Sequence, residues 1–285
     1  SFIVPIVGST GLGRGGHNRA MSLDTTNPDV SLSIASLHVY PIKSCGGIAL
    51  DESLVIETGL EFDRAWMVVD AAGMFVTQRE LPRMALIQPT LKQSEMVLRA
   101  PGMLALHVAL DRVETATQAT VWNDTVKAFD MGALAAQWFT DFLGRPARLV
   151  RFDPEQQRLA DMKWTGGVAA ETAFSDGFPL LVANAASLAD FNARLAARGA
   201  APVTMQRFRP NLVLSGLQSW DEDHVDELVL QTDEGPVRLK LVKPCTRCSI
   251  PDVDPASATT SHEVGDLLQS FRSDPRMQGG VTFGI

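Results

Sequence analysis

Two cysteines near the carboxyl-terminal end of the chain have the spacing of a reactive or metal-binding pair. Cys245 and Cys248 enclose Thr246 and Arg247 and lead into a turn rich in proline and aspartate, within LKLVKPCTRCSIPDVDP at 239–255. Thiolates at this spacing bind metals or exchange electrons. The stretch therefore predicts a site of metal or sulfur chemistry.

Four interpretations of this pair are open. A structural zinc site needs four ligands, and only Cys45 and scattered histidines such as His262 remain to complete it. A thioredoxin-type pair needs a following helix whose dipole lowers the thiol pKa, and Pro251 and Pro255 leave no room for one. Two cysteines buried in a core would not have Arg247 between them. The interpretation that fits best is one thiolate on a soft transition metal, carried by an anionic cofactor that an arginine grips through paired hydrogen bonds.

The composition bounds the class of protein. The chain has 285 residues and a formal net charge of -8, which disfavours nucleic acid as a partner because a phosphate backbone attracts an excess of Lys and Arg. No apolar run reaches the roughly 18 residues of a transmembrane helix, so no membrane partner is expected. Three cysteines are too few for the disulfide framework of a secreted protein. These features favour a cytoplasmic protein.

The two ends of the chain carry weaker signals. Residues 1–30 include GLGRGG at 11–16, but no lysine followed by serine or threonine comes after the glycines, so a phosphate loop is not predicted. We expect a flexible leader or cloning remnant here, with Met21 as the native start. The last residues, VTFGI at 281–285, begin a strand pattern without completing it, which suggests that carboxyl-terminal sequence is missing.

The elements that must position the cysteine pair are mainly strands. Short β-type runs between turn residues predict an antiparallel β domain from 34 to about 125, and two polar fragments interrupt it, YPIKSC at 40–45 and FDRAW at 62–66. Helical spacing of apolar residues predicts a helix over 133–143 that ends at Gly144.

A second β-rich part extends from about 145 to the end. ARLVRF predicts a strand, and another is expected at 180–183. It is followed by a helix that begins at Asn184 or Ser187 and stops at Gly199. Three more strands are expected in RFRPNLVLSG, DELVL and VRLKLVK, the last of which delivers the cysteine pair.

Six fragments in order carry a family resemblance. They are YPIKSCGG at 40–47, DRAWMVVD at 63–70, TQRELPRMALI at 77–87, FSDGFPLLV at 174–182, FRPNLVLSG at 208–216 and KPCTRCSIPDVDP at 243–255. On these residues the chain resembles MOSC proteins with a MOSC N-terminal β-barrel domain, the group of the mitochondrial amidoxime-reducing component and its bacterial counterparts. The resemblance implies a mainly β fold with helical insertions (α+β), in which a β-barrel-like domain at 31–130 packs on a MOSC β-barrel domain at 131–285.

The resemblance also implies a molybdenum cofactor, whose metal is held by a pterin dithiolene with a phosphate tail. By matching position, Cys248 is the protein thiolate on molybdenum. The residues implied to contact the phosphate and the pterin are Lys43, Ser44, Arg64, Arg209, Asn211, Thr246 and Arg247, and we add Ser175 and Asp176 because an aspartate suits an aminopyrimidine edge.

Several of these residues have a plainer interpretation. Lys43 and Arg64 could be solvated surface charges, and Arg209 could form a structural salt bridge with Asp221 or Asp226. Asp176 could cap a turn. Cys45 matches the family fragment but has no role that we can derive, so it is expected to be a small core residue.

The activity implied by the resemblance is reduction of an N-hydroxylated compound, such as an amidoxime, a hydroxylamine or an N-hydroxylated base, to the amine. Electrons must come from a partner, either a reductase or a ferredoxin-type protein, because no cysteine follows Cys248 and a plant-type iron–sulfur cluster cannot form in this chain. Some bacterial members carry a ferredoxin domain after the MOSC domain, and that domain could have been lost with the missing terminus. The alternative is a carrier that holds the cofactor or a persulfide on Cys248 without turnover, because MOSC domains also occur in cofactor sulfurases.

Overall fold

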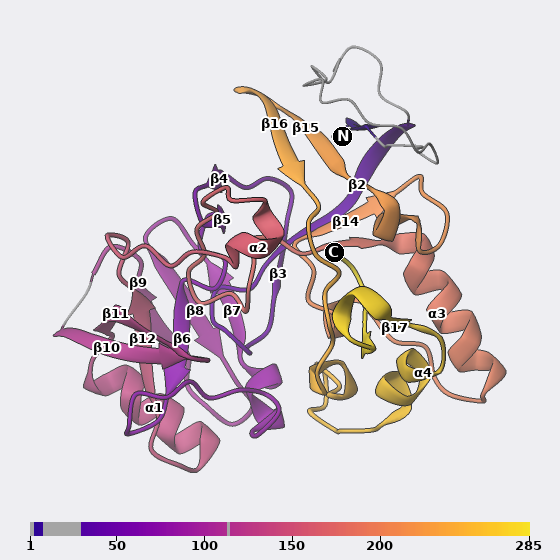
Figure 1. The fold of residues 1–285 in the computed structure, drawn as a ribbon. Helices are drawn as coiled ribbons and strands as arrows, with labels where there is room; N and C mark the ends of the chain where they lie inside the picture. Colours follow the sequence, from indigo (N-terminus) through magenta and orange to yellow (C-terminus); the bar gives the residue numbers. More distant parts are fainter. Residues whose placement is uncertain (1–2, 8–29, 113–114) are drawn as a thin grey trace.

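The computed structural model describes residues 3–7, 30–112 and 115–285, and they form two lobes that lie side by side (Figure 1). The first lobe contains the sheets of β6 to β12 with helix α1, and the second contains the largest sheet with helices α3 and α4. Strands dominate both lobes, so the prediction of a mainly β fold with helical insertions is confirmed. Each helix within the described ranges is too short or too polar to cross a membrane.

The sheet of the second lobe combines strands from both ends of the chain. Its order is β13-β14-β2-β1-β15-β16, with β3 paired to β2, and only the β13–β14 pair is parallel. The strands are β1 (Ile3–Val7), β2 (Val30–Val39), β3 (Ile48–Leu50), β13 (Val182–Asn184), β14 (Leu212–Ser215), β15 (Glu227–Thr232) and β16 (Gly235–Lys240). Because Leu212 pairs with Leu37, the end of β2 delivers the YPIKSC fragment to the boundary between the lobes.

The first lobe contains a four-stranded sheet, β10-β11-β12-β6, and a three-stranded sheet, β7-β8-β9. Their strands are β6 (Trp66–Val69), β7 (Gln88–Leu91), β8 (Glu95–Arg99), β9 (Leu106–Ala109), β10 (Thr115–Val121), β11 (Asp124–Asp130) and β12 (Arg148–Phe152). Short hairpins are formed by β4 (Val55–Ile56) with β5 (Gly59–Leu60), and by β17 (Ser273–Asp274) with β18 (Gly280–Val281).

The closed barrels that the resemblance implies are not found among the described strands. All of their sheets are open, because β2 pairs with β1 and β14 in the second lobe instead of closing a sheet with β6 to β12. The predicted division at residue 130 assigns β2 to the amino-terminal domain, whereas its ladder belongs to strands from the other end of the chain. The division itself stays a prediction.

The predicted leader contains one described strand. Residues 3–7 form β1, which pairs with β2 and β15, so the expectation of a flexible leader does not describe these five residues. The GLGRGG motif and Met21 lie outside the described residues. At the other end of the chain, Ile285 and Val182 exchange backbone hydrogen bonds of 2.9 and 2.7 Å, so the final strand pattern is paired.

The two predicted helices are found close to their predicted boundaries, and the described residues contain two further helices. Helix α1 (Ala133–Leu143) ends at Gly144 in the left-handed conformation, as predicted. Helix α3 (Ala185–Ala197) begins at Asn184, whose side chain accepts a hydrogen bond from the Ala186 amide, whereas Ser187 bonds to buried Glu222 instead. The remaining helices are α2 (Met162–Thr165) and α4 (Glu263–Phe271), neither of which was predicted.

Separate apolar cores fix the two lobes and carry the site fragments on their edges. In the first lobe, Phe139 and Phe142 of α1 are buried in the same apolar cluster as Trp66. In the second lobe, Phe208 stacks on Phe283 with ring centroids 3.7 Å apart. Trp66 is the last residue of the FDRAW fragment, and Phe208 is the first residue of FRPN. Burial of these two rings therefore fixes the backbone of both fragments at the boundary between the lobes.

Candidate functional site

The YPIKSC fragment leaves β2 and turns at the boundary between the lobes. The Lys43 amide donates to the Trp66 carbonyl at 2.8 Å. Ser44 is buried and has a φ of 66°, and its carbonyl accepts a hydrogen bond from the Gln78 side chain at 2.7 Å. These bonds fix the turn against the first lobe.

Lys43 is a buried cation within this turn. Its ammonium donates to the Phe174 carbonyl at 2.8 Å and to an Asp176 carboxylate oxygen at 2.5 Å. Burial lowers the pKa of Lys43, although the Asp176 carboxylate acts in the opposite direction. Lys43 is only 6% exposed, so it is not a solvated surface charge.

Asp176 and Ser175 differ in what they can offer to a ligand. The Asp176 carboxylate also accepts a hydrogen bond from the Trp122 indole at 3.0 Å, yet its side chain remains largely exposed. Ser175 is buried, and its carbonyl accepts a hydrogen bond from the Arg158 guanidinium at 2.7 Å. Asp176 is therefore accessible to a ligand, whereas the Ser175 backbone anchors the loop.

Arg64 is held by acceptors of the protein itself. Its Nη1 lies 2.7 and 2.6 Å from the two carboxylate oxygens of buried Asp63 and 3.2 Å from Asn211 Oδ1. Its Nη2 donates to the Arg209 carbonyl at 3.0 Å. The Asn211 side chain also accepts a hydrogen bond from the Leu181 amide and donates one to the His38 carbonyl. Arg64 and Asn211 therefore join the two lobes and have little hydrogen-bonding capacity left for a ligand.

Tyr40 lies between two guanidinium groups. The guanidinium carbons of Arg64 and Arg209 are 4.4 and 4.2 Å from the centroid of its ring. Such stacking is favourable, and more so away from water. Gly47 makes room for the ring, because a Cβ at that position would lie 2.4 Å from it. Sequence reasoning did not assign Tyr40 to the site, and the available signal is that the chain's single tyrosine stands in YPIKSC.

Arg209 retains hydrogen-bonding capacity beside Tyr40. Its Nη1 donates to the Cys45 carbonyl at 2.5 Å, whereas its Nη2 is buried and has no partner in the described part of the chain. Burial, with the nearby Arg64 guanidinium adding to it, lowers the pKa of Arg209 to about 10. No carboxylate in the same ranges pairs with Arg209, so the structural salt bridge weighed from the sequence is not found there.

Unpartnered buried donors concentrate around this arginine. Five buried side-chain polar atoms lack a partner within the described ranges, and three of them are Tyr40 Oη, Arg209 Nη2 and Arg247 Nε. Arg247 belongs to the same neighbourhood, because its Nη2 donates to the Phe208 carbonyl at 2.7 Å. An unsatisfied buried group costs about 1–3 kcal/mol, and guanidinium N–H groups can only donate. The cluster therefore suits an acceptor-rich anion.

The cysteine loop is held by the carboxyl-terminal residues. The Cys245 amide donates to the Gly284 carbonyl at 2.9 Å, the Phe283 amide donates to the Cys245 carbonyl at 3.1 Å, and the Arg247 amide donates to the Val281 carbonyl at 2.8 Å. This short ladder fixes the backbone before Cys248. Figure 1 shows the loop and the carboxyl terminus together in the second lobe.

The two cysteines of the loop have different surroundings. Cys248 is exposed, whereas Cys245 is half-buried and its sulfur lies 3.0 Å from Nη1 of Arg247. Neither thiol is a core position. The residues that follow form only a single 3-10 turn, Ile250–Asp252, so the α-helix of a thioredoxin-type pair is absent directly after Cys248, as the sequence predicts.

The three thiols are expected to react at different rates with iodoacetamide. Cys45 is fully buried, and burial raises its pKa to about 12, whereas Cys248 is exposed. Because the accessible thiolate is the nucleophile, Cys248 is expected to be alkylated first and Cys45 only after urea is added. Timed alkylation with peptide mass spectrometry measures the order. Equal rates for Cys45 and Cys248 in native buffer would contradict the described burial.

Backbone strain also gathers at this boundary. Eight described non-glycine residues have positive φ, and three of them are Ser44 (66°), Arg64 (48°) and Arg209 (58°). A non-glycine residue in this region costs about 1–3 kcal/mol and persists only where its surroundings hold it. Such strain is frequent at functional sites.

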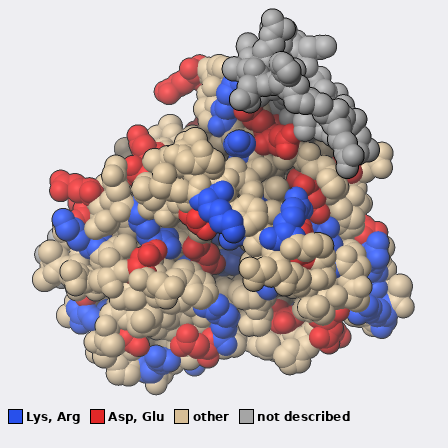
Figure 2. All heavy atoms as spheres, in the orientation of Figure 1, with Lys and Arg blue, Asp and Glu red and all other residues tan. Residues whose placement is uncertain are grey.

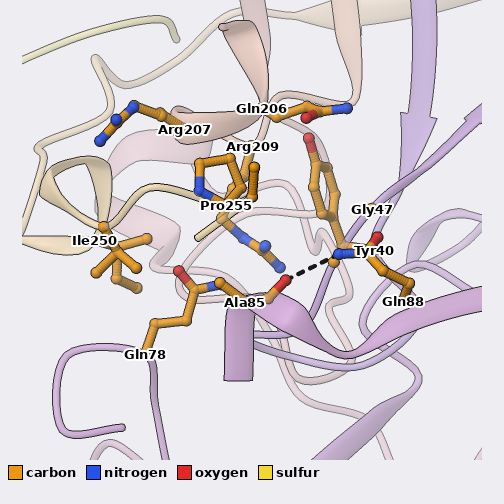
Figure 3. Close-up of a pocket in the computed structure, with 13 residues that line it drawn as sticks. Tyr40, Gly47, Gln78, Ala85, Gln88, Gln206, Arg207, Arg209, Ile250 and Pro255 are labelled. Carbon is orange, nitrogen blue, oxygen red and sulfur yellow. Dashed lines mark hydrogen bonds between the residues drawn. The ribbon is translucent and has the colours of Figure 1, made fainter. Parts of the chain in front are cut away.

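A cavity of about 190 Å³ opens between the lobes beside Tyr40 (Figure 3). Residues that line it include Tyr40, Gln78 and Gln88 on one side and Gln206, Arg209 and Pro255 on the other. Gln88 is held by its hydrogen bond to the Ala85 carbonyl at 3.0 Å, drawn dashed in Figure 3. Figure 2 shows Lys and Arg side chains on both sides of the hollow between the lobes.

These observations test whether the predicted cofactor fits the residues present. The free donors of Arg209 and Arg247 suit a phosphate tail, and the exposed Cys248 thiol, next to Arg247 in the chain, is a donor of the type that a soft metal prefers. Within the described ranges no three His, Cys, Asp or Glu side chains gather as metal ligands. The donor set therefore fits an anionic ligand at the cavity and a thiolate-bound metal at the loop.

The structure brings most of the predicted site residues together. Contacts join Lys43 to Asp176, and they join Arg64 to both Asn211 and Arg209. Thr246 is exposed and pairs with Thr282 through its backbone. Thr246 and Cys248 are connected to this group as the chain neighbours of Arg247. Sequence reasoning missed Tyr40, Asp63 and the glutamines of the cavity.

Fold and site together define a two-lobed β protein with a donor-rich cavity between its lobes and a thiol-bearing loop beside it. Residues 31–146 match the model of the MOSC N-terminal beta barrel domain, and residues 169–285 match that of the MOSC domain. The chain belongs to the family of MOSC proteins that combine these two domains, related to the mitochondrial amidoxime-reducing components.

Relatives with two kinds of name are similar to this chain. Mitochondrial amidoxime reducing component 2 of Rattus norvegicus is 34% identical over 89% of this chain and 78% of its own length. Mitochondrial amidoxime-reducing component 1 of Homo sapiens is 35% identical over 85% of this chain and 73% of its own length. Molybdenum cofactor sulfurase of Danio rerio is 32% identical over 93% of this chain but only 33% of its own length. The chain is therefore a MOSC protein that is similar to proteins named for amidoxime reduction and for the molybdenum cofactor.

Proposed function

We propose that this chain is a molybdenum-cofactor-dependent oxidoreductase that reduces N-hydroxylated compounds, namely amidoximes, hydroxylamines and N-hydroxylated bases, to the amines. The N–O bond breaks, two electrons and two protons are taken up, and water leaves. When bound, the cofactor would supply the two-electron chemistry and the oxygen-accepting metal. The observation that carries the proposal is the cluster of unpartnered buried donors beside the cysteine loop.

The residues of the chain have distinct roles in this proposal. Cys248 is the thiolate ligand of the metal, because it is the exposed thiol of the loop. Arg209 and Arg247 donate to the phosphate tail, because each has a buried N–H group without a partner among the described residues. The remaining cofactor contacts are proposed for Lys43, Ser44, Ser175, Asp176 and Thr246. Arg64 and Asn211, whose side chains bond mainly within the protein, are proposed to hold the cofactor site in place at the boundary between the lobes.

The partners follow from the chemistry. Two electrons must be delivered for each product, and we propose that a separate reductase or ferredoxin-type protein supplies them. The other partner is the small N-hydroxylated substrate. We propose a cytoplasmic location, which the low cysteine content supports.

The test uses protein made in a host that builds the cofactor. The purified chain is supplied with benzamidoxime and a reduced viologen dye, and benzamidine is measured by chromatography. Turnover is expected for the wild-type chain and for Cys245→Ala, and a loss to background is expected for Cys248→Ala. Stoichiometric molybdenum without any reduced N-hydroxylated compound would exclude the reductase.

That last outcome would favour a carrier of the cofactor or of a persulfide on Cys248. Two observations support this second candidate: Cys248 is exposed, and relatives named molybdenum cofactor sulfurase align with most of this chain. A carrier requires an accessible thiol but no electron donor. Sulfur transferred from Cys248 to an acceptor, with no benzamidine formed, would establish it.

A further inference from the structure

Tyr40 has a feature that its place in the core does not explain. The side chain is 1% exposed, and its hydroxyl is buried without a hydrogen-bond partner in the described part of the chain. Phenylalanine would fill the same space without leaving a polar group unsatisfied. A buried hydroxyl of this kind is unfavourable unless something outside the protein completes it.

The ring of Tyr40 is held so that its hydroxyl has one fixed position. Arg64 and Arg209 stack on it at 4.4 and 4.2 Å, and the Tyr40 amide donates to Asp63 Oδ1 at 2.8 Å. The absence of a side chain at Gly47 lets the ring lie against that backbone. Fixing a donor before a ligand arrives reduces the entropy that binding must overcome.

Tyr40 and Arg209 both line the cavity between the lobes. Figure 3 shows the Tyr40 side chain, which follows the end of β2, extending toward Gln206 with Arg209 beside it. The free Arg209 Nη2 is a second donor at this wall. Asp63 neutralises Arg64, but no carboxylate within the described ranges pairs with Arg209, so positive charge remains uncompensated.

We propose that Tyr40 is a ligand-binding residue whose hydroxyl donates a hydrogen bond to the phosphate tail of the bound cofactor, next to Arg209 Nη2. The inference rests on the proposed function for the identity of the ligand. A phosphate monoester suits this position, because it offers several charged acceptor oxygens to donors that have no acceptor in the described part of the protein. The ring positions Arg209, and the hydroxyl contacts the ligand.

The single tyrosine makes the test specific. Full-length protein with tyrosine labelled by ¹³C at Cζ, made without cofactor, gives one tyrosine resonance, which arises from Tyr40. Inorganic phosphate is expected to shift this resonance in a saturable manner. In Tyr40→Phe, phosphate affinity measured by calorimetry is expected to fall about tenfold or more, as for a hydrogen bond to a charged acceptor. Absence of a shift, or affinity unchanged within twofold, would overturn the proposal.

Two further measurements complete the test. The first distinguishes a ligand-binding hydroxyl from a structural one, and the second distinguishes a site for free phosphate from the site of the cofactor tail. The thermal midpoint of cofactor-free Tyr40→Phe is expected to equal or exceed that of the wild-type chain, because the substitution removes an unsatisfied group. A lower midpoint would indicate a structural hydroxyl and contradict the proposal. In cofactor-loaded protein the Tyr40 resonance is expected to ignore added phosphate, and a persisting response would show that the tail lies elsewhere.

The outcome is independent of the reductase test. If benzamidoxime is reduced but Tyr40→Phe binds phosphate and retains molybdenum like the wild-type chain, this inference fails and the proposed function stands. If phosphate binding depends on the hydroxyl but no N-hydroxylated compound is reduced, the proposed function fails and the role of Tyr40 in phosphate binding stands.

Discussion

Asp63→Ala is expected to lower the free energy of unfolding by about 3 kcal/mol, the lower end of the range for breaking a buried ion pair. Asp63 is 2% exposed and accepts hydrogen bonds from both the Arg64 guanidinium and the Tyr40 amide. Its removal leaves the Arg64 charge without a carboxylate. Arg64 keeps the Asn211 and Arg209 oxygens as acceptors, which is why the upper end of the range is not expected.

Urea denaturation followed by tryptophan fluorescence measures this loss. Glu95→Ala is the matched control, because Glu95 also accepts from two basic side chains, Lys92 and His107, but on an exposed surface. Exposed ion pairs contribute about 0–1 kcal/mol, so the control is expected to unfold close to the wild-type midpoint. Equal losses in the two variants would mean that Asp63 is not the buried junction described.

Arg209→Ala is expected to weaken cofactor binding about 10- to 100-fold, which corresponds to the roughly 1.5–3 kcal/mol of hydrogen bonds to a charged group. Arg209 stacks on Tyr40, donates to the Cys45 carbonyl and carries the free Nη2 at the cavity. Arg209→Lys is expected to recover little of the loss, because an ammonium cannot stack and donate as a planar fork does.

Molybdenum retained after extended dialysis is the readout for these variants. Arg198→Ala serves as the control, because Arg198 is an exposed arginine whose guanidinium contacts only the Ser270 hydroxyl in the described ranges. Full retention by Arg209→Ala would place the anionic tail away from the cavity wall. Full recovery by Arg209→Lys would reduce the role of Arg209 to its charge.

Local sequence signals were sufficient for helices with clear ends. Gly144 terminates α1 and Asn184 begins α3 because both act through their own backbone neighbours. Helix α4 lacks such a signal, since no side chain caps its start and Gly265 lies inside it. The buried face of Val264, Leu267 and Leu268 stabilises this helix, and packing of that kind cannot be predicted from a short window.

Pairing between distant strands was beyond the sequence. The strand character of β2 could be predicted from its residues, but its partner β14 comes from residues more than 170 positions later in the chain. Nothing local distinguishes a strand that closes a barrel from one that joins another lobe. The barrel domains were therefore implied by the family resemblance alone, whereas the structure shows that the described sheets are open.

The site was predicted in part for a similar reason. A charged residue within an apolar fragment, such as Lys43 or Arg64, is conspicuous in a sequence. Lys43 is buried, and the Arg64 side chain is only 13% exposed. Tyr40 is not conspicuous, because an aromatic residue at the end of a strand is typical of a core. Its unpartnered hydroxyl, like the free Nη2 of Arg209, becomes visible only once every neighbour is in place.

The most direct test of the account is the molybdenum content of three proteins made in a host that builds the cofactor: the wild-type chain, Cys248→Ala and Cys245→Ala. The account predicts about one molybdenum for each wild-type chain, a similar content in Cys245→Ala, and a loss of most of the metal in Cys248→Ala, whose exposed thiol is the proposed ligand. Molybdenum retained in full by Cys248→Ala, or absent from the wild-type chain while zinc is present, would contradict it.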